Sequence, residues 1–384
     1  MSSVSADLSL QTRARRLADE LETVATTGMF GDGAAIAATA AVYYAGSARM
    51  LASVLGIDGD QIAPHPVPHV ESLRRSMIDR ALSSVFAGDK AAAAEEIAAY
   101  TPLHQLAGSP DAQADAAAWT AEGEPTFMSA WVADPLADRI ITTFNDGMAQ
   151  HKDGSAVVPV DPTPEERETF DVGLGLMRRA VPRLTADVLA AVPALALFDG
   201  PLVSGYSAAT PLFVFVNRKT FDDPVEGAEM MQHECLHQKL NDIGIARSLF
   251  RADYDDDLSA KITVPWGRPG TPLPRHFSAD RTFAAFHVYS HQALLHLGML
   301  ACAKDGEEAE AAVELLSVSW ARAAHFDLPS QAEDIQAELG ADGRRLIQWL
   351  SALVARLGEF EIYPGEQLSS RRGAVYDRHM PETV

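Results

Sequence analysis

The chain has little cysteine, little positive charge and no long hydrophobic run. Cys235 and Cys302 are its only cysteines in 384 residues, which excludes a disulfide framework and fits a reducing compartment. The first twenty residues lack the apolar core of a signal peptide, so we expect a cytoplasmic protein. The most apolar stretch, residues 33–56, is rich in alanine and interrupted by Arg49, which predicts a packed helix and no membrane span.

The charge balance excludes some classes of partner. Lys and Arg together number 31 against 53 Asp and Glu, which gives a net charge of −22. A surface this acidic disfavours nucleic acid and anionic membranes as partners. Hydrophobic residues make up 47% of the chain, which is enough for a packed core of one or two domains. Composition leaves the oligomeric state open.

The pattern along the chain predicts two regions. Residues 1–155 show apolar side chains at helical spacing, which predicts a helical N-terminal region. Residues 151–164 are rich in proline, glycine and charge, and we place the boundary there. Residues 156–384 are then the metal-binding catalytic region.

The second region begins with a strong helix start. Thr163, Pro164 and Glu166 form a capping box with proline in the first turn, and the helix should run to about Val192. Short apolar runs at 194–198, 202–206 and 211–217 predict strands. A further helix is expected from Pro224, with Asp223 as its cap. The predicted fold class is α+β and predominantly helical, with a zincin-like core of a small sheet, this helix and a second ligand helix.

The expected helix carries the sequence His-Glu-x-x-His. His233 and His237 are four residues apart and so lie on one helix face, about one turn from each other. This spacing lets both imidazoles reach one metal ion, with Glu234 beside them. The alternative is a helix that carries two histidines by chance and binds no metal. The capped helix, the strands before it and the histidines after it favour the metal site.

The third ligand is not where zinc peptidases usually have it. Leu240 and Ile243 occupy the glycine and histidine positions of the extended metzincin motif, which excludes that class. No glutamate occurs between Glu234 and Glu307, so a thermolysin-like ligand from the next helix is absent. Asp280 could serve an aspartate-type zincin, but the motif that usually surrounds it is missing.

Histidines on the next predicted helix, within residues 281–297, are the remaining candidates. His287 and His291 again share a face, whereas His296 lies about 180° around the helix from His287. We therefore expect His296 to be a core histidine. The predicted metal ligands are His233, His237 and His287, with His291 as the alternative third ligand.

Three neutral imidazoles suit either zinc hydrolysis or the oxygen chemistry of Fe(II). In the second case 2-oxoglutarate can supply the negative charge that the protein ligands lack. Its distal carboxylate is best bound by an arginine that donates two hydrogen bonds to it. Arg281 and Arg275 are the candidates, because they lie just before the helix that carries the third ligand.

The segment from about Leu202 to Leu300 resembles a known family. The matching pieces are "SGYSAATPLFVFVN", "HECLHQKLND", "VPWGRPG" and "RTFAAFHVYSH", in this order. They are similar to the HExxH-motif family of 2-oxoglutarate-dependent peptide β-hydroxylases, found in gene clusters for ribosomally made, modified (RiPP-type) peptides. The resemblance implies a zincin-like fold that binds Fe(II) and 2-oxoglutarate, an oxygenase (dioxygenase) activity and a peptide or peptide-like substrate.

Glu234 separates the leading function from its alternatives. In a zinc metallopeptidase it would be the general base, whereas an oxygenase needs no such base and could use it to bind substrate or order the site. A non-catalytic peptide-binding protein is a third possibility. Trp266, in a Pro- and Gly-rich loop, is expected to pack inside that loop, with a wall of the substrate cleft as the alternative.

Overall fold

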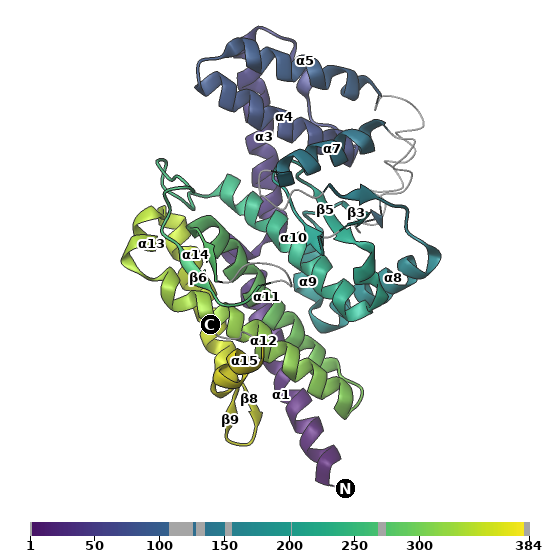
Figure 1. Cartoon of the computed structure of the whole chain (residues 1–384), viewed down its shortest axis with the longest axis vertical. Coiled ribbons are helices and arrows are strands. Elements are labelled where there is room, and N and C mark those ends of the chain that lie inside the picture. The colour runs from purple at the N-terminus through teal and green to yellow at the C-terminus, as the bar shows by residue number, and fades with distance from the viewer. Residues whose placement is uncertain are drawn as a thin grey trace. The chain divides into compact units, whose positions relative to one another are not determined.

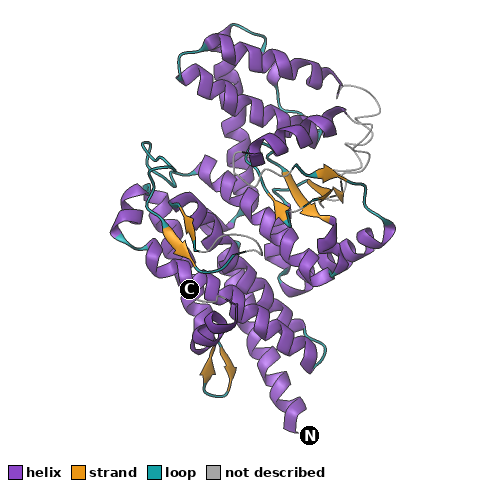
Figure 2. Ribbon diagram, viewed as in Figure 1, coloured by secondary structure: helices purple, strands orange, loops and turns teal. Residues whose placement is uncertain are grey.

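The computed structural model describes residues 2–106, 126–127, 135–149, 156–200, 202–267 and 274–379. Helices dominate these residues, and short strands form three small sheets (Figure 1, Figure 2). The predicted class, α+β and mostly helical, is confirmed. None of the helices in this part of the chain is long and apolar enough to cross a membrane.

The chain folds into two compact units, each built from several segments. Unit 1 contains residues 1–32, 175–186 and 247–384, and unit 2 contains residues 33–174 and 187–246. Neither unit matches the predicted regions 1–155 and 156–384, because both units draw on both halves of the chain. The proposed start of the catalytic region near residue 155 stays a prediction, and residues 151–155 lie outside the described part.

Unit 2 combines long helices with the largest sheet. Its strands follow the order β1-β3-β5-β4, with β3 parallel to both β1 and β5, while β4 and β2 run antiparallel to β5 and β3. The helical elements are α3 (Gly33–Leu55), η1 (Gly59–Ile62), α4 (Pro68–Phe86), α5 (Lys90–Leu106), α7 (Pro135–Ala149), η2 (Arg218–Asp222) and α10 (Pro224–Ala246). The strands are β1 (Thr126–Phe127), β2 (Val158–Pro159), β3 (Ala194–Asp199), β4 (Ser204–Gly205) and β5 (Phe213–Asn217).

The central strands of this sheet are apolar because both of their faces are covered. All of β5 and all of β3 except Asp199 are buried, which explains the continuous apolar runs in the sequence. Phe144 of α7 stacks on Phe215 of β5 with ring centroids 3.8 Å apart. Helix α10, which follows β5 in the chain after η2, packs against both α3 and β5. The core of unit 2 therefore fixes the helix that carries the histidine motif.

Unit 1 is a helical bundle with two β-hairpins. Its helical elements are α1 (Ser2–Ala25), α2 (Gly28–Gly31), α11 (Ala279–Cys302), α12 (Gly306–Ser330), α13 (Glu333–Glu338), α14 (Ala341–Gly358), η3 (Leu368–Arg371) and α15 (Arg372–His379). The hairpins pair β6 (Ile262–Val264) with β7 (Arg275–Phe277), and β8 (Glu361–Tyr363) with β9 (Glu366–Gln367). Helix α11 packs against α1, α12 and α14, so it is the central helix of this unit.

The predicted helix start at Thr163 is confirmed, but the predicted length is wrong. Glu166 accepts a hydrogen bond from the Thr163 backbone N–H at 2.7 Å, and the Thr163 hydroxyl accepts one from the Glu166 N–H at 3.2 Å. The helix ends at Ala180, and a second helix begins at Pro182. Proline has no N–H to continue the ladder, so the expected helix to Val192 becomes α8 (Pro164–Ala180) and α9 (Pro182–Leu189).

Gly298 permits a close helix contact inside unit 1. A Cβ at this position would lie 2.7 Å from the carbonyl carbon of Ala180 and closer still to its oxygen. We expect Gly298→Ala to lower the free energy of unfolding by about 1–3 kcal/mol, because backbone atoms would have to shift. Chemical denaturation measures this change. Gly306→Ala is the matched control, since its Cβ would meet nothing within 4 Å. Equal stabilities of the two variants would contradict the close contact.

Candidate metal centre

Local sequence places the histidine motif on α10. The Asp223 carboxylate accepts a hydrogen bond from the Val225 backbone N–H at 2.8 Å, and Pro224 is the first helical residue. Both predictions about this helix start are thus confirmed. The helix continues without a break through His233 and His237, so the two imidazoles are held one turn apart.

The two imidazoles approach each other with their Nε2 atoms. The Nε2 atoms of His233 and His237 lie 3.1 Å apart, and the ring centroids are 4.8 Å apart. Burial lowers the pKa of His237 to about 4, so its ring is neutral at pH 7. A neutral imidazole carries a lone pair that can bind a metal ion. The pair therefore offers two nitrogen donors on one helix face.

Glu234 lies beside this pair and is almost fully buried. Its residue exposure is 2%, and its Oε1 atom is 3.9 Å from Nε2 of His233. The carboxylate is thus close to the histidine nitrogens without ion-pairing firmly to them. Cys235, on the same helix, is 1% exposed and is thus a small buried side chain.

Tyr206, which follows β4, completes the immediate surroundings. Its ring stacks on His237 with centroids 6.3 Å apart and planes 16° apart. Its hydroxyl oxygen is buried and makes no hydrogen bond within the described part of the chain. Burial raises the pKa of Tyr206 well above its usual value, and the Asp242 carboxylate adds to this effect. The phenol therefore stays protonated and can donate one hydrogen bond.

Gln238 connects α10 to the turn before β5. Its Oε1 accepts a hydrogen bond from the Leu212 backbone N–H at 2.6 Å, and its Nε2 donates to Asp242 at 3.0 Å. Leu212 has a φ of 73°, a left-handed conformation that is costly for leucine. The buried amide of Gln238 thus stabilises this turn and fixes the orientation of α10 next to His237.

Lys239 of α10 and Asp187 of α9 form a buried ion pair. The Lys239 ammonium contacts Asp187, whose other oxygen accepts a hydrogen bond from the Gly33 backbone N–H at the start of α3. Lys239 is 1% exposed. Only glycine fits at position 33, because a Cβ there would lie 2.7 Å from the Asp187 backbone and side-chain oxygens. This contact ties α10 to the first turn of α3.

Unit 1 holds the other predicted ligands on α11. His287 and His291 are fully buried, with ring centroids 4.5 Å apart. Nδ1 of His291 lies 2.7 Å from the His287 carbonyl oxygen, which can only accept. Nδ1 therefore carries a hydrogen, and in the neutral form of the ring the lone pair is on Nε2. His296 bonds to Ser319 of α12 at 3.0 Å, so the expectation of a core histidine is confirmed.

Arg275 and Arg281, the predicted cations for 2-oxoglutarate, come together at one ring. Their guanidinium carbons lie 4.9 Å and 5.0 Å from the centroid of Phe277 in β7. Arg281 is exposed, whereas Arg275 is partly buried. The structure thus places both arginines at the N-terminal end of α11, in the unit that also contains His287 and His291.

The predicted set of ligands is divided between the units. His233, Glu234 and His237 belong to unit 2, and His287 and His291 belong to unit 1. Within the described ranges, no three His, Cys, Asp or Glu side chains form a group that could hold a metal ion. The three-histidine site stays a prediction, and the structure brings together its first two members.

Neither a protein-family model nor any curated protein matches this chain.

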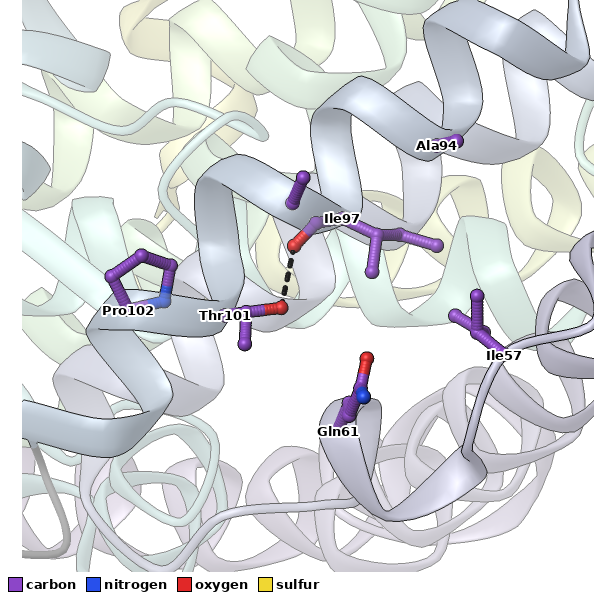
Figure 3. Close-up of a pocket in the computed structure, with 7 residues that line it drawn as sticks. Ile57, Gln61, Ala94, Ile97, Thr101 and Pro102 are labelled. Atoms are coloured by element: carbon purple, nitrogen blue, oxygen red, sulfur yellow. Dashed lines mark hydrogen bonds between the residues drawn. The ribbon is translucent and has the colours of Figure 1, made fainter.

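A cavity elsewhere in unit 2 offers no catalytic chemistry. It has a volume of about 340 Å³ and lies between α5 and the segment around η1 (Figure 3). The residues that line it are Ile57, Gln61, Ala94, Ile97, Ala98, Thr101 and Pro102. The Thr101 hydroxyl already donates to the Ile97 carbonyl at 3.0 Å. The cavity therefore supplies no acid, base or metal ligand.

Sequence reasoning missed Tyr206 and Gln232. Gln232 is fully buried, and neither its amide nitrogen nor its amide oxygen has a hydrogen-bond partner among the residues that the structure describes. Its only sequence signal is its place directly before the motif. Tyr206 gave a weak signal as a tyrosine at the end of a strand run, but its contact with His237 spans 31 positions of the chain and needed the fold.

Asp242 provides a test of the buried polar side of α10. Burial raises the pKa of Asp242 from 3.8 to about 6, despite the opposing effects of Arg75 and of the Gln238 hydrogen bond. The folded state therefore binds more protons than the unfolded state between these values, so stability falls as pH rises from about 3.8 to about 6.

Asp242→Asn keeps an oxygen acceptor for Gln238 and removes the ionisation. We expect the variant to be more stable than the wild type at pH 7.5 by about 1–3 kcal/mol, and the difference to vanish near pH 4. Urea denaturation of both proteins at a series of pH values measures this difference. A difference that does not change with pH would contradict the burial of an ionised Asp242.

Proposed function

We propose that this protein is an Fe(II)- and 2-oxoglutarate-dependent oxygenase that hydroxylates a β carbon in a peptide or peptide-like substrate. The observation that carries the proposal is the pair of Nε2 atoms, 3.1 Å apart, that His233 and His237 present from α10. The resemblance of residues 202–300 to the HExxH-motif family of peptide β-hydroxylases supports the choice of chemistry.

The residues present fit a metal ion. Two nitrogens 3.1 Å apart have the spacing of neighbouring ligands whose metal–nitrogen bonds are about 2.1 Å long. A hydrogen bond between the rings would also fit this distance, but it would leave the buried Tyr206 hydroxyl unexplained. Imidazole nitrogens are suitable ligands for both iron and zinc. The third ligand remains the sequence prediction, His287 or His291, and the proposal rests on the pair alone.

The chain's own residues have distinct tasks in this proposal. Bound Fe(II) and 2-oxoglutarate would supply dioxygen activation, with 2-oxoglutarate, O2 and a C–H group giving succinate, CO2 and a C–OH group. His233 and His237 hold the ion, and burial keeps the His237 ring neutral. Tyr206 orients the His237 ring by stacking on it, and its buried hydroxyl has one hydrogen bond to donate. Arg275 and Arg281 are the candidate cations for the distal carboxylate.

A zinc metallopeptidase is the second candidate, because of the position of Glu234. Its Oε1 atom lies 3.9 Å from His233 Nε2, which is near enough to act on a water molecule beside the histidine pair. The burial of this carboxylate supports the oxygenase, in which Glu234 has a structural task, since a general base must meet water and substrate.

The reaction products test the proposed function. The full chain is incubated with Fe(II), ascorbate, 2-oxoglutarate, oxygen and a pooled peptide library. We expect succinate in the assay and peptides heavier by about 16 Da, with both lost in His237→Ala and after chelation, because the nitrogen pair would no longer hold the metal. Mass spectrometry and succinate quantification give the readouts. Peptide cleavage with zinc and no succinate would overturn the proposal.

Glu234→Gln separates the two candidates. The amide keeps the size of the side chain but cannot act as a base. An oxygenase should keep at least about a tenth of its succinate production, whereas a peptidase should lose at least about 100-fold in activity. Thermal unfolding of the variant is the control for a purely structural loss. Loss of activity in a variant as stable as the wild type would favour the peptidase.

A further inference from the structure

Helix α11 has a second polar face inside unit 1. Tyr289 lies two residues from both His287 and His291, so it points about 160° away from each of them around the helix. His296, which bonds to Ser319 of α12, lies on the same side as Tyr289. Helix α12 therefore covers the face that is turned away from the two histidines predicted as metal ligands.

Arg322 of α12 lies on this second face, against two aromatic rings. Its guanidinium carbon is 5.8 Å from the centroid of Trp266 and 5.4 Å from that of Tyr289. Contacts of this kind hold a guanidinium in place and leave its N–H groups free to bind. The indole N–H of Trp266 donates to the Tyr289 hydroxyl at 3.3 Å, which fixes the two rings relative to each other.

Among the residues that the structure describes, the guanidinium of Arg322 has no polar partner. Its Nε atom is buried and makes no hydrogen bond, and no carboxylate of the described residues pairs with it. The side chain as a whole is partly exposed, so ligands can reach it from solvent. A buried N–H without an acceptor is unfavourable, so a ligand oxygen that accepts from this guanidinium is expected to bind favourably.

Several other arginines of unit 1 have the carboxylate partner that Arg322 lacks among the described residues. Arg371 also lies over an aromatic ring, with its guanidinium carbon 5.4 Å from the Tyr363 centroid, but its Nε bonds to Glu366 at 2.8 Å. Further arginines of this unit are paired with carboxylates: Arg251 with Asp253, Arg345 with Asp342, Arg356 with Glu20 and Glu359, and Arg378 with Glu314. Arg322 has the aromatic contact without a carboxylate among the described residues. Arg281 and Arg372 also lie over rings in this way, but both are exposed, whereas the Nε of Arg322 is buried.

His325, which also contacts the Trp266 ring, does not replace that carboxylate. His325 lies 5.0 Å from Trp266 between ring centroids. Its Nε2 donates to the Thr263 carbonyl at 2.8 Å, so its Nδ1 accepts from the Tyr376 hydroxyl at 2.7 Å. Burial lowers the pKa of His325, with a further contribution from Arg372. The surroundings of Arg322 are thus neutral or positive.

We propose that Arg322, Trp266 and Tyr289 form a binding site for a carboxylate, on the face of α11 that is turned away from His287 and His291. A guanidinium presents two parallel N–H groups that match the two oxygens of a carboxylate. A single guanidinium suits a planar carboxylate better than a phosphate, because its two parallel N–H groups match two oxygens in one plane. The site does not depend on the proposed oxygenase function, because all three residues lie in unit 1 on the face of α11 away from His287 and His291.

Isothermal titration calorimetry of the full chain at low ionic strength tests this site. The probes are succinate, a doubly blocked Gly-Asp-Gly peptide and the matching Gly-Asn-Gly peptide. Succinate represents a free organic acid and the Asp peptide a carboxylate on a polypeptide, so their relative affinities identify the source. The variants are Arg322→Lys, which keeps the positive charge but lacks the two parallel N–H groups of a guanidinium, and Arg322→Gln, which removes the charge. Arg371→Gln is the matched control, an arginine on a ring that already has its carboxylate.

We expect at least one carboxylate probe to bind the wild type and the Asn peptide not to bind. Arg322→Lys should weaken binding at least tenfold, and Arg371→Gln should leave it within twofold of the wild type. Arg322→Lys provides the decisive comparison if Arg322→Gln does not fold. Binding of equal strength in wild type and Arg322→Lys would overturn the proposal. It would also be overturned if neither carboxylate probe bound the wild type at a probe concentration 50-fold above about 1 mM.

Discussion

The buried ion pair between Lys239 and Asp187 is the interaction on which the histidine-bearing helix depends. A helix with Gln232, Glu234, Gln238, Lys239 and Asp242 almost fully buried would be unstable without partners for its polar groups. Asp187 provides one by accepting from both Lys239 and the first N–H of α3. Removing one partner of such a pair typically costs about 3–5 kcal/mol. Together with the Gln238 hydrogen bonds, the pair holds α10 in the rotation that sets the direction of His233 and His237.

Features determined by local chemistry could be predicted from the sequence. The capping box at Thr163, the start of α10 at Pro224 and the buried strands β3 and β5 each follow from a few neighbouring residues. The close approach of the two motif imidazoles follows from helix geometry. The division into units could not be predicted, because each unit combines segments far apart in the chain.

Long-range contacts explain what sequence reasoning missed. Tyr206 becomes part of the candidate centre through stacking on His237, and Arg322 becomes distinctive because Trp266 and Tyr289 flank it. The expectation that Trp266 packs within its own loop was too narrow, since this residue contacts α11 and α12. The two faces of α11 give this helix two separate chemical environments, one with buried histidines and one with an arginine that lacks a carboxylate.

Anaerobic titration of the full chain with Fe(II), with the heat of binding measured by calorimetry, tests the central claim that His233 and His237 bind one ion together. The account predicts one ion per chain, and a loss of affinity of at least about tenfold in His233→Ala and in His237→Ala, because each variant removes one of the nitrogen donors. Cys235→Ala, on the same helix, should bind as the wild type does. Iron affinity unchanged in both histidine variants would contradict the account.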